Sequence, residues 1–196
     1  MTKKEIRAQI GSQRRSLDPA WISAHSRRIE ATVLGLPVLA QAKTVGCYLA
    51  LPGEVETEGI LRHCWEAGKR VCVPAMREET ACYEMAAMQA DTAVVRRPGN
   101  GPEPVSGDWV RPADVDLLIV PGVAFDDGCG RLGRGGGHYD RIMEGLAEAG
   151  NSSPVFWGLG FEFQIVRCVP MAAHDVRLDL VVTQERVLRA SRRVSA

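Results

Sequence analysis

The pattern of apolar and polar positions opens with two helices. Over residues 3–16, apolar positions recur at helical spacing and form one stripe, which is bordered by a basic stripe. Asp18 then caps a second helix with Pro19 at its first position, and Leu36-Pro37 ends that helix. The basic stripe of the first helix consists of Lys3, Arg7 and Arg14.

Short apolar runs of strand length follow the two helices. TVGCYLA (44–50) is predicted as a strand, and after the loop LPGEVE a helix runs from Thr57 to about Ala67, closed by Gly68. RVCVPA (70–75) is the next strand. A strand–loop–helix–strand unit is typical of a parallel sheet with helices packed on it.

The second half of the chain continues this alternation. DVDLLIVPGVAF (114–125) holds the most apolar run and predicts a central buried strand, and a helix from about His138 to Ala149 ends at Gly150. No internal repeat is present. We therefore predict one α/β domain over residues 1–196, with three α/β/α layers and a predominantly parallel sheet. The remaining predicted strands are CYEMAAM (82–88), VFWGLGF (155–161) and LDLVVT (178–183).

Two segments are predicted to lack regular structure. RRPGNGPEPVSGD (96–108) is rich in proline and glycine, and a long structureless loop inside a compact domain is usually functional or mobile. The last six residues, SRRVSA (191–196), are predicted to be a solvated tail.

Composition narrows the class of protein. Of the 196 residues, 45% are hydrophobic and 24% charged, as in soluble globular domains, and 24 basic residues balance 24 acidic ones. This balance gives no overall field for nucleic acid or an anionic membrane, so neither is an expected partner. No apolar run is long enough to span a bilayer, and the N-terminus lacks a signal-peptide core. The six cysteines never form C-x-x-C, so we expect reduced thiols in a cytoplasmic protein. We also expect a monomer.

The glycine-rich segment RLGRGGGHYDR (131–141) matches neither of two familiar phosphate motifs. The P-loop requires Gly-Lys-Ser/Thr, which is absent. Gly128, Gly130 and Gly133 satisfy G-x-G-x-x-G, but PGVAFDD separates them from the strand and no acidic residue ends a strand about 20 positions later. A nicotinamide or flavin site is therefore not expected.

The same segment nevertheless has the composition of an anion site. Glycines let backbone N–H groups approach a ligand, a helix N-terminus adds positive partial charge, and arginines add charge-assisted hydrogen bonds. Together these groups predict a site for a nucleoside triphosphate; a flexible loop before a capped helix is the alternative. The candidate residues are Arg131, Arg134, the run Gly135-Gly136-Gly137 and the helix start His138-Tyr139-Asp140.

Two aspartates are candidates for a metal site. Asp140 would repel a bound phosphate unless a cation stood between them, so we interpret it as a magnesium ligand. Asp175 would supply a second carboxylate, because adjacent strand ends of a parallel sheet converge on one edge; a turn aspartate is the alternative. A zinc site of Cys129, His138 and His174 matches no structural zinc spacing.

The loop after the first predicted strand suggests a second ligand. Glu54 and Glu56 stand there beside Tyr48 and Leu49. A carboxylate at a strand's carboxyl end, next to aromatic and apolar side chains, suits a flat heterocycle with N–H donors. A solvated loop glutamate is the alternative.

A long motif connects these candidates to a known family. LIVPGVAFDDGCGRLGRGGGHYDR (118–141) resembles the signature of the 5-formyltetrahydrofolate cyclo-ligase family, also called 5,10-methenyltetrahydrofolate synthetase. The resemblance extends over nearly the whole chain: the K-x-x-x-R pattern of Lys3 and Arg7, YLALPGEVET (48–57), PEP (102–104) and HDVRLDLVVT (174–183) all fit it.

The resemblance implies a reaction, a fold and a set of site residues. 5-Formyltetrahydrofolate and ATP would give 5,10-methenyltetrahydrofolate, ADP and phosphate with Mg²⁺, on a fold similar to that of sugar-phosphate isomerases and CoA transferases. Arg134 and Asp140 would be catalytic, and Asp140 with Asp175 would hold magnesium. ATP would contact Lys3, Arg7, Arg131, Leu132, Gly133, Arg134, Gly135, Gly136, Gly137, His138 and Tyr139. Folate would contact Leu49, Glu54, Arg134, Gly135, Gly136, Gly137 and His138.

The chain departs from the family pattern in two places. His138 stands where a tyrosine is common, and RRPGNG replaces an aromatic residue before the loop that contains PEP. Neither change removes a proposed phosphate or magnesium contact, so activity is expected. The alternative is a folate- or nucleotide-binding module without efficient turnover.

Overall fold

The computed structural model describes residues 1–96, 101–105, 107–149, 154–172 and 175–190. A seven-stranded sheet forms its centre, in the order β12-β11-β9-β6-β1-β2-β3. The five strands from β11 to β2 run parallel, and β12 and β3 pair antiparallel at the two edges. The strands are β1 (Thr44–Gly46), β2 (Arg70–Arg77), β3 (Cys82–Ala87), β6 (Leu117–Pro121), β9 (Val155–Leu159), β11 (Leu180–Val182) and β12 (Val187–Arg189).

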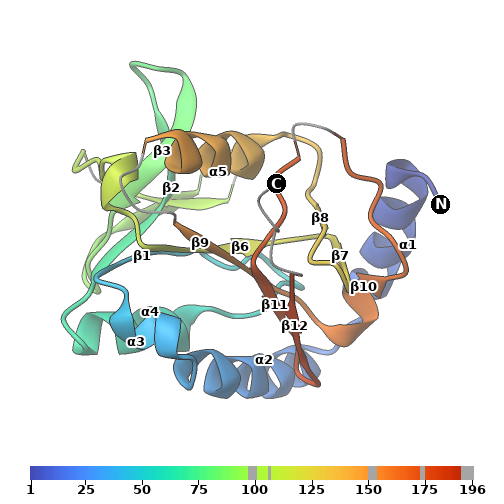
Figure 1. The fold of residues 1–196 in the computed structure, drawn as a ribbon. Helices are drawn as coiled ribbons and strands as arrows, with labels where there is room; N and C mark the ends of the chain where they lie inside the picture. The colour runs from blue at the N-terminus through green and yellow to red at the C-terminus, as the bar shows by residue number, and fades with distance from the viewer. Residues whose placement is uncertain (97–100, 106, 150–153, 173–174, 191–196) are drawn as a thin grey trace.

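Helices cover both faces of this sheet (Figure 1). Three of them pack on one face: α2 (Pro19–Leu34), α3 (Pro37–Gln41) and α4 (Glu58–Glu66). On the other face lies α5 (His138–Glu148). Separate buried apolar clusters fill the two interfaces, so the predicted three-layer α/β/α fold with a mostly parallel sheet is confirmed.

The first helix, α1 (Lys3–Arg15), lies apart from these layers, beside a three-stranded sheet (Figure 1). Ile6 and Ile10 are buried against this sheet, as their helical spacing predicts. Thr2 and Glu5 form a reciprocal capping box that fixes the start of α1. The small sheet has the order β10-β7-β8 and consists of β7 (Ala124–Asp126), β8 (Arg131–Leu132) and β10 (Ile165–Val166).

Several predicted boundaries were wrong for local reasons. The strand predicted over 114–125 is split: η1 (Pro112–Asp114) is a 3₁₀ turn, β6 ends at Pro121, and β7 joins the small sheet. Pro121 has no N–H to donate, and a Cβ on Gly122 would lie 2.4 Å from the Phe125 ring, so the chain bends between the two strands. The strand predicted over 44–50 stops at Gly46.

The segment 96–108 is also more regular than predicted. β4 (Val94–Arg96) pairs with β5 (Pro102–Pro104) in a two-stranded sheet, while residues 97–100 and 106 lie outside the described residues. Pro37 begins α3 instead of only ending α2. The remaining 3₁₀ turn is η2 (Glu162–Gln164). The predicted tail over 191–196 lies outside the part that is described.

Candidate active site

A cavity of about 420 Å³ lies at the carboxyl ends of β1 and β6. In a parallel sheet, this edge is where ligands usually bind. The loop after β1, the turn after β6, the glycine-rich segment and the start of α5 all contribute to the wall. Its lining residues are Tyr48, Leu49, Leu51, Glu54, Pro74, Tyr83, Gly101, Pro102, Glu103, Pro121, Gly122, Val123, Arg131, Gly133, Arg134, Gly136, Gly137, His138, Tyr139 and Asp140.

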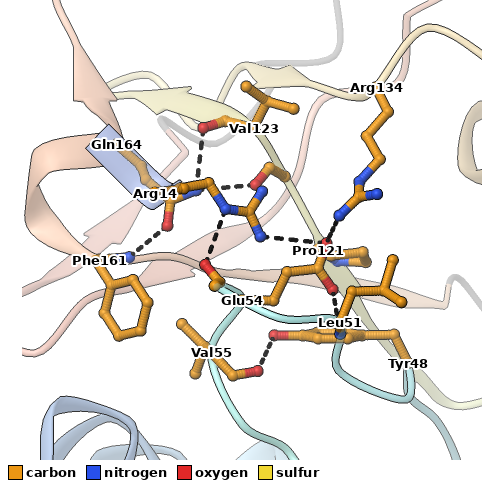
Figure 2. Close-up of polar contacts among 12 residues, drawn as sticks. Arg14, Tyr48, Leu51, Glu54, Val55, Pro121, Val123, Arg134, Phe161 and Gln164 are labelled. Carbon is orange, nitrogen blue, oxygen red and sulfur yellow. Dashed lines mark hydrogen bonds and ion pairs between the residues drawn. The ribbon is translucent and has the colours of Figure 1, made fainter. Parts of the chain in front are cut away.

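The loop after β1 forms a hydrogen-bonded wall of this cavity (Figure 2). The Tyr48 hydroxyl donates to the Val55 carbonyl at 2.9 Å, which closes the loop over the buried ring. Leu51 and Glu54 form two hydrogen bonds: the Glu54 N–H donates to the Leu51 carbonyl, and the Leu51 N–H donates to Glu54 Oε2 at 3.0 Å. Burial raises the pKa of Tyr48 well above its ordinary value, so its hydroxyl is a permanent donor here.

Two arginines from distant parts of the chain converge on the Glu54 carboxylate (Figure 2). Arg134 Nη2 donates to Glu54 Oε1 at 2.9 Å, and Arg14 Nη2 lies 3.3 Å from the same oxygen. Glu54 is only 6% exposed, so these two cations compensate a nearly buried charge. The carboxylate is therefore held in one orientation at the cavity wall.

The glycine-rich segment turns sharply into α5. Gly135 and Gly137 adopt positive φ values of 111° and 67°, and Gly137 is the N-cap of the helix. Because L-residues with a side chain are strained at such φ values, glycine permits this turn, which brings the N-terminus of α5 to the cavity wall. The predicted combination of glycine loop and helix N-terminus is thus present at one cavity wall.

Replacing Gly137 by alanine is expected to destabilise the protein by about 1–2 kcal/mol, because an L-residue is strained at this φ. The new Cβ would also lie 3.4 Å from Arg141 Nη1. Gly145→Ala in the middle of the same helix is the matched control: nothing lies within 4 Å of its Cβ position, so stability should rise by about 0.5–1 kcal/mol. Urea denaturation gives the free energy of unfolding of both variants. Equal changes in the two variants would contradict the assignment of strain to Gly137.

Arg131 and Asp140 form an ion pair at 2.6 Å inside this wall. Arg131 also donates to the Pro121 carbonyl at 3.2 Å, and its guanidinium lies 5.7 Å from the centre of the Tyr139 ring. Its Nε atom is buried without a hydrogen-bond partner among the described residues. Asp140 is one-quarter exposed and lines the cavity, so its carboxylate remains accessible to a ligand.

A hydrogen-bonded turn supports the strand that carries Arg131. Asp126 Oδ1 accepts from the N–H groups of Gly128 and Gly130 at 3.0 and 2.8 Å, and Oδ2 accepts from the Val169 N–H at 2.8 Å. A Cβ on Gly130 would lie 2.7 Å from Asp126 Oδ2, so this turn excludes larger residues there. Arg131 consequently leaves the turn in a fixed direction.

The turn after β6 has its own support (Figure 2). Gln164 donates from Nε2 to the carbonyls of Gly122 and Val123 at 2.9 and 3.0 Å, and its Oε1 accepts from the Phe161 N–H. Gln164 is 2% exposed, so this amide is a buried brace between η2 and the cavity wall.

Some predicted site residues do not line the cavity. Lys3 pairs with Asp175 at 2.6 Å across 172 positions of sequence, and Arg7 donates from Nε to the Gly133 carbonyl at 2.9 Å. Of the basic stripe on helix α1, Arg7 therefore contacts the glycine-rich segment, whereas Lys3 contacts Asp175. Residues predicted for the site that are not lining residues are Lys3, Arg7, Leu132, Gly135 and Asp175.

His138 lies in a cluster that the sequence did not reveal. Its ring is 4.6 Å from that of Tyr83, whose hydroxyl donates to Glu103 Oε1 at 2.6 Å. Partial burial, and then the Arg141 guanidinium, lower the pKa of His138 below its ordinary value. The imidazole is therefore neutral at pH 7 and offers one donor and one acceptor.

Sequence reasoning missed several lining residues, among them Tyr83 and Glu103. Glu103 stands in the PEP motif and pairs with Val95 of β4, but its side chain reaches β2, where its Oε2 accepts from the Met76 N–H at 3.2 Å. Arg14 was visible as a member of the basic stripe, yet its partner Glu54 is 40 positions away and no local pattern connects them.

The described ranges contain no cluster of side chains suited to a metal site. No three His, Cys, Asp or Glu side chains come together there as a metal site, and His174 lies outside those ranges. Burial raises the pKa of Cys129 to about 11, so its thiol is protonated at neutral pH. The helices that the structure describes include none long and apolar enough to cross a membrane.

Curated proteins similar to this chain carry one name. The 5-formyltetrahydrofolate cyclo-ligase of Escherichia coli K12 is 30% identical over 181 residues, covering 91% of this chain and 98% of that protein. The mouse (Mus musculus) protein of the same name is 27% identical over 197 residues, covering 93% and 94%.

Solved structures agree with these relatives. The Aquifex aeolicus 5,10-methenyltetrahydrofolate synthetase superposes with a TM-score of 0.83 at 27% identity, covering all of this chain and 96% of that one. The Mycoplasma pneumoniae synthetase, at 22% identity and a TM-score of 0.73, shares the fold. Residues 1–184 match the sequence pattern of the family to which these names refer, so the chain belongs to the 5-formyltetrahydrofolate cyclo-ligase family.

Proposed function

We propose that this protein is an enzyme that converts 5-formyltetrahydrofolate to 5,10-methenyltetrahydrofolate, using ATP and Mg²⁺ and releasing ADP and phosphate. One observation carries the proposal: a single cavity joins an anchored carboxylate, Glu54, to a glycine-rich helix N-terminus with arginines. The first group suits a heterocycle with N–H donors and the second suits phosphate. Family membership supports the folate as one of the two substrates.

The folate would bind at the Glu54 wall. Glu54 presents carboxylate oxygens that accept hydrogen bonds, and the pterin ring of the folate carries N–H donors. Leu49 and Tyr48 line the same region and offer apolar surface to a flat ring. His138, neutral at pH 7, lies at the junction with the glycine-rich segment and would contact either ligand.

The triphosphate of ATP would bind at the glycine-rich wall. Backbone N–H groups at Gly136 and Gly137 and the N-terminus of α5 favour negative charge. Arg134 is 58% exposed and can turn towards a phosphate, and Arg7 is fixed beside Gly133. Each charge-assisted hydrogen bond of this kind contributes roughly 1.5–3 kcal/mol.

The carboxylates suit magnesium in a nucleotide complex. Mg²⁺ prefers oxygen ligands and is commonly held by one or two carboxylates together with substrate phosphates. Asp140 lines the cavity at the phosphate wall and would be one ligand; Asp175, beside Lys3, would be the second. When bound, the cation would neutralise charge on the phosphates.

The chemistry requires positioning more than a protein nucleophile. The formyl oxygen attacks the γ-phosphorus of ATP, and the bond from phosphorus to the bridging oxygen breaks to give ADP. N10 then attacks the formyl carbon and loses its proton, and the carbon–oxygen bond breaks to release phosphate. Arginines and backbone N–H groups stabilise the charge that moves in the first step, and the closed wall around Glu54 holds the ring in place for the second.

Replacing Arg134 by alanine is expected to raise the apparent KM for ATP or folate about tenfold or more, with a smaller effect on kcat. Arg134 contributes charge-assisted binding and no proton transfer, so its loss acts mainly through KM. Steady-state kinetics with each substrate varied in turn measures the change. An unaltered dependence on both substrates would argue against a ligand contact at Arg134.

The experiment that tests the proposal follows ADP release from ATP in the presence of 5-formyltetrahydrofolate. The proposal expects ADP only when folate, ATP and Mg²⁺ are all present. Quenching of tryptophan fluorescence by the folate without ADP release would instead identify a binding module that has lost turnover.

A further inference from the structure

Arg14 lies at the junction of the two cavity walls, although it does not line the cavity itself. It stands in the last turn of α1, its side chain is 10% exposed, and its Nε donates to the Gly53 carbonyl at 2.8 Å. Gly53 has a φ of 79°, and a Cβ there would approach Arg14 to within 3.4–3.6 Å. Glycine at 53 therefore lets the loop after β1 lie directly against the arginine.

One carboxylate oxygen is shared between two guanidinium groups (Figure 2). Arg134 Nη2 donates a hydrogen bond to Glu54 Oε1 at 2.9 Å. Arg14 Nη2 is 3.3 Å from that oxygen, but it is buried and has no hydrogen-bond partner in the described part of the chain. A buried donor without a partner is unfavourable, so Arg14 is poised to take this oxygen whenever Arg134 leaves it.

The two arginines differ in their freedom to move. Arg134 is 58% exposed and belongs to the glycine-rich segment proposed to bind phosphate, whereas Arg14 is buried and tied to Gly53. We infer that Arg14 is a positioning residue that keeps the Glu54 carboxylate in its folate-binding orientation once Arg134 turns to the phosphates of ATP. This inference rests on the proposed function for the identity of the two ligands.

Helix α1 offers a way to distinguish an effect of Arg14 on Glu54 from a general loosening of the helix. Helix α1 also carries Arg7, which contacts the glycine-rich segment through the Gly133 carbonyl. A change that merely loosened α1 would weaken nucleotide binding as well as folate binding. A change at Arg14 that acts through Glu54 alone would weaken folate binding selectively.

The test uses the full chain with Arg14→Met, which keeps the apolar stem against Gly53 and removes the guanidinium. Arg15→Met is the control, since Arg15 is the exposed neighbour in the same turn. Calorimetric titration with 5-formyltetrahydrofolate, in the presence of Mg²⁺ and a non-hydrolysable ATP analogue, should show about tenfold weaker binding for Arg14→Met. Without the analogue the loss should be smaller, because Arg134 still holds Glu54. Affinity for the analogue alone should fall by less than this, because Arg134 can leave Glu54 only at the cost of an uncompensated carboxylate, and Arg15→Met should match the parent protein.

A second readout does not depend on the ligands. Hydrogen–deuterium exchange over residues 51–54 should be faster in Arg14→Met than in Arg15→Met, because the Leu51–Glu54 turn loses one anchor. Unchanged exchange, or equal weakening of folate and nucleotide binding, would overturn the inference. If Arg14→Met does not fold, Arg14→Lys should show the same selective loss of folate affinity, but a smaller one. If the parent protein binds no 5-formyltetrahydrofolate, the proposed function fails, and the exchange experiment alone decides the role of Arg14.

Discussion

Replacing Asp140 by asparagine is expected to lower magnesium-dependent turnover by roughly a hundredfold or more, as for the loss of one preorganised electrostatic contact in a transition state. The substitution removes a charge at the cavity wall without changing the side-chain volume. The remaining amide oxygen still accepts from Arg131, which at present pairs with the carboxylate at 2.6 Å, so the fold should persist. Turnover measured across a series of Mg²⁺ concentrations gives the effect.

Glu144→Gln is the matched control for Asp140→Asn. Glu144 is an exposed carboxylate one turn further along α5, so its substitution changes the net charge equally and leaves the cavity untouched. Turnover of this variant should match that of the parent protein. If Asp140→Asn also retained full turnover at limiting Mg²⁺, Asp140 would not be a magnesium ligand.

Replacing Phe125 by alanine is expected to lower the free energy of unfolding by about 3–5 kcal/mol. The ring is fully buried, and glycines 122, 158 and 160 pack against it so closely that a Cβ on any of them would lie 2.4–2.7 Å from a ring atom. Glycines have no side chains that could fill the space, so truncation leaves a cavity next to the turn after β6. For a protein of this size, the melting temperature should fall by roughly 6–20 °C.

Phe163→Ala provides the comparison for Phe125→Ala. Phe163 is only half-buried, and it stacks on Phe161 with ring centres 6.0 Å apart. Phe163→Ala should lower the free energy of unfolding clearly less than Phe125→Ala does, as measured by thermal and urea denaturation. Equal losses of unfolding free energy in the two variants would show that the close packing of glycines around Phe125 does not make this position more important for stability.

Local patterns were sufficient for the layers of the fold and for one wall of the site. Asp18 caps α2 through a 2.6 Å bond to the Ala20 N–H, and Gly68 ends α4 with a positive φ, as predicted from residue type alone. The glycine-rich segment could be identified because its arginines, glycines and helix start are contiguous in sequence. Its ligand contacts remain a prediction.

The rest of the site depends on contacts between distant segments. Lys3 meets Asp175, and Arg14 meets Gly53, only after the sheet has assembled, and no periodicity encodes either pair. The split at Pro121 likewise depends on the Phe125 ring, which occupies the space beside Gly122. Strands as short as β8 and β10, each of two residues, carry too little periodic signal to be recognised.

The central claim is that one cavity couples ATP cleavage to ring closure of the folate. The most direct measurement mixes the purified protein with 5-formyltetrahydrofolate, ATP and Mg²⁺, and follows the near-ultraviolet absorbance of methenyltetrahydrofolate together with ADP release. Both signals should rise in equal amounts, and neither should rise when ATP is omitted. Product formation without ADP, or ADP release without product, would contradict it.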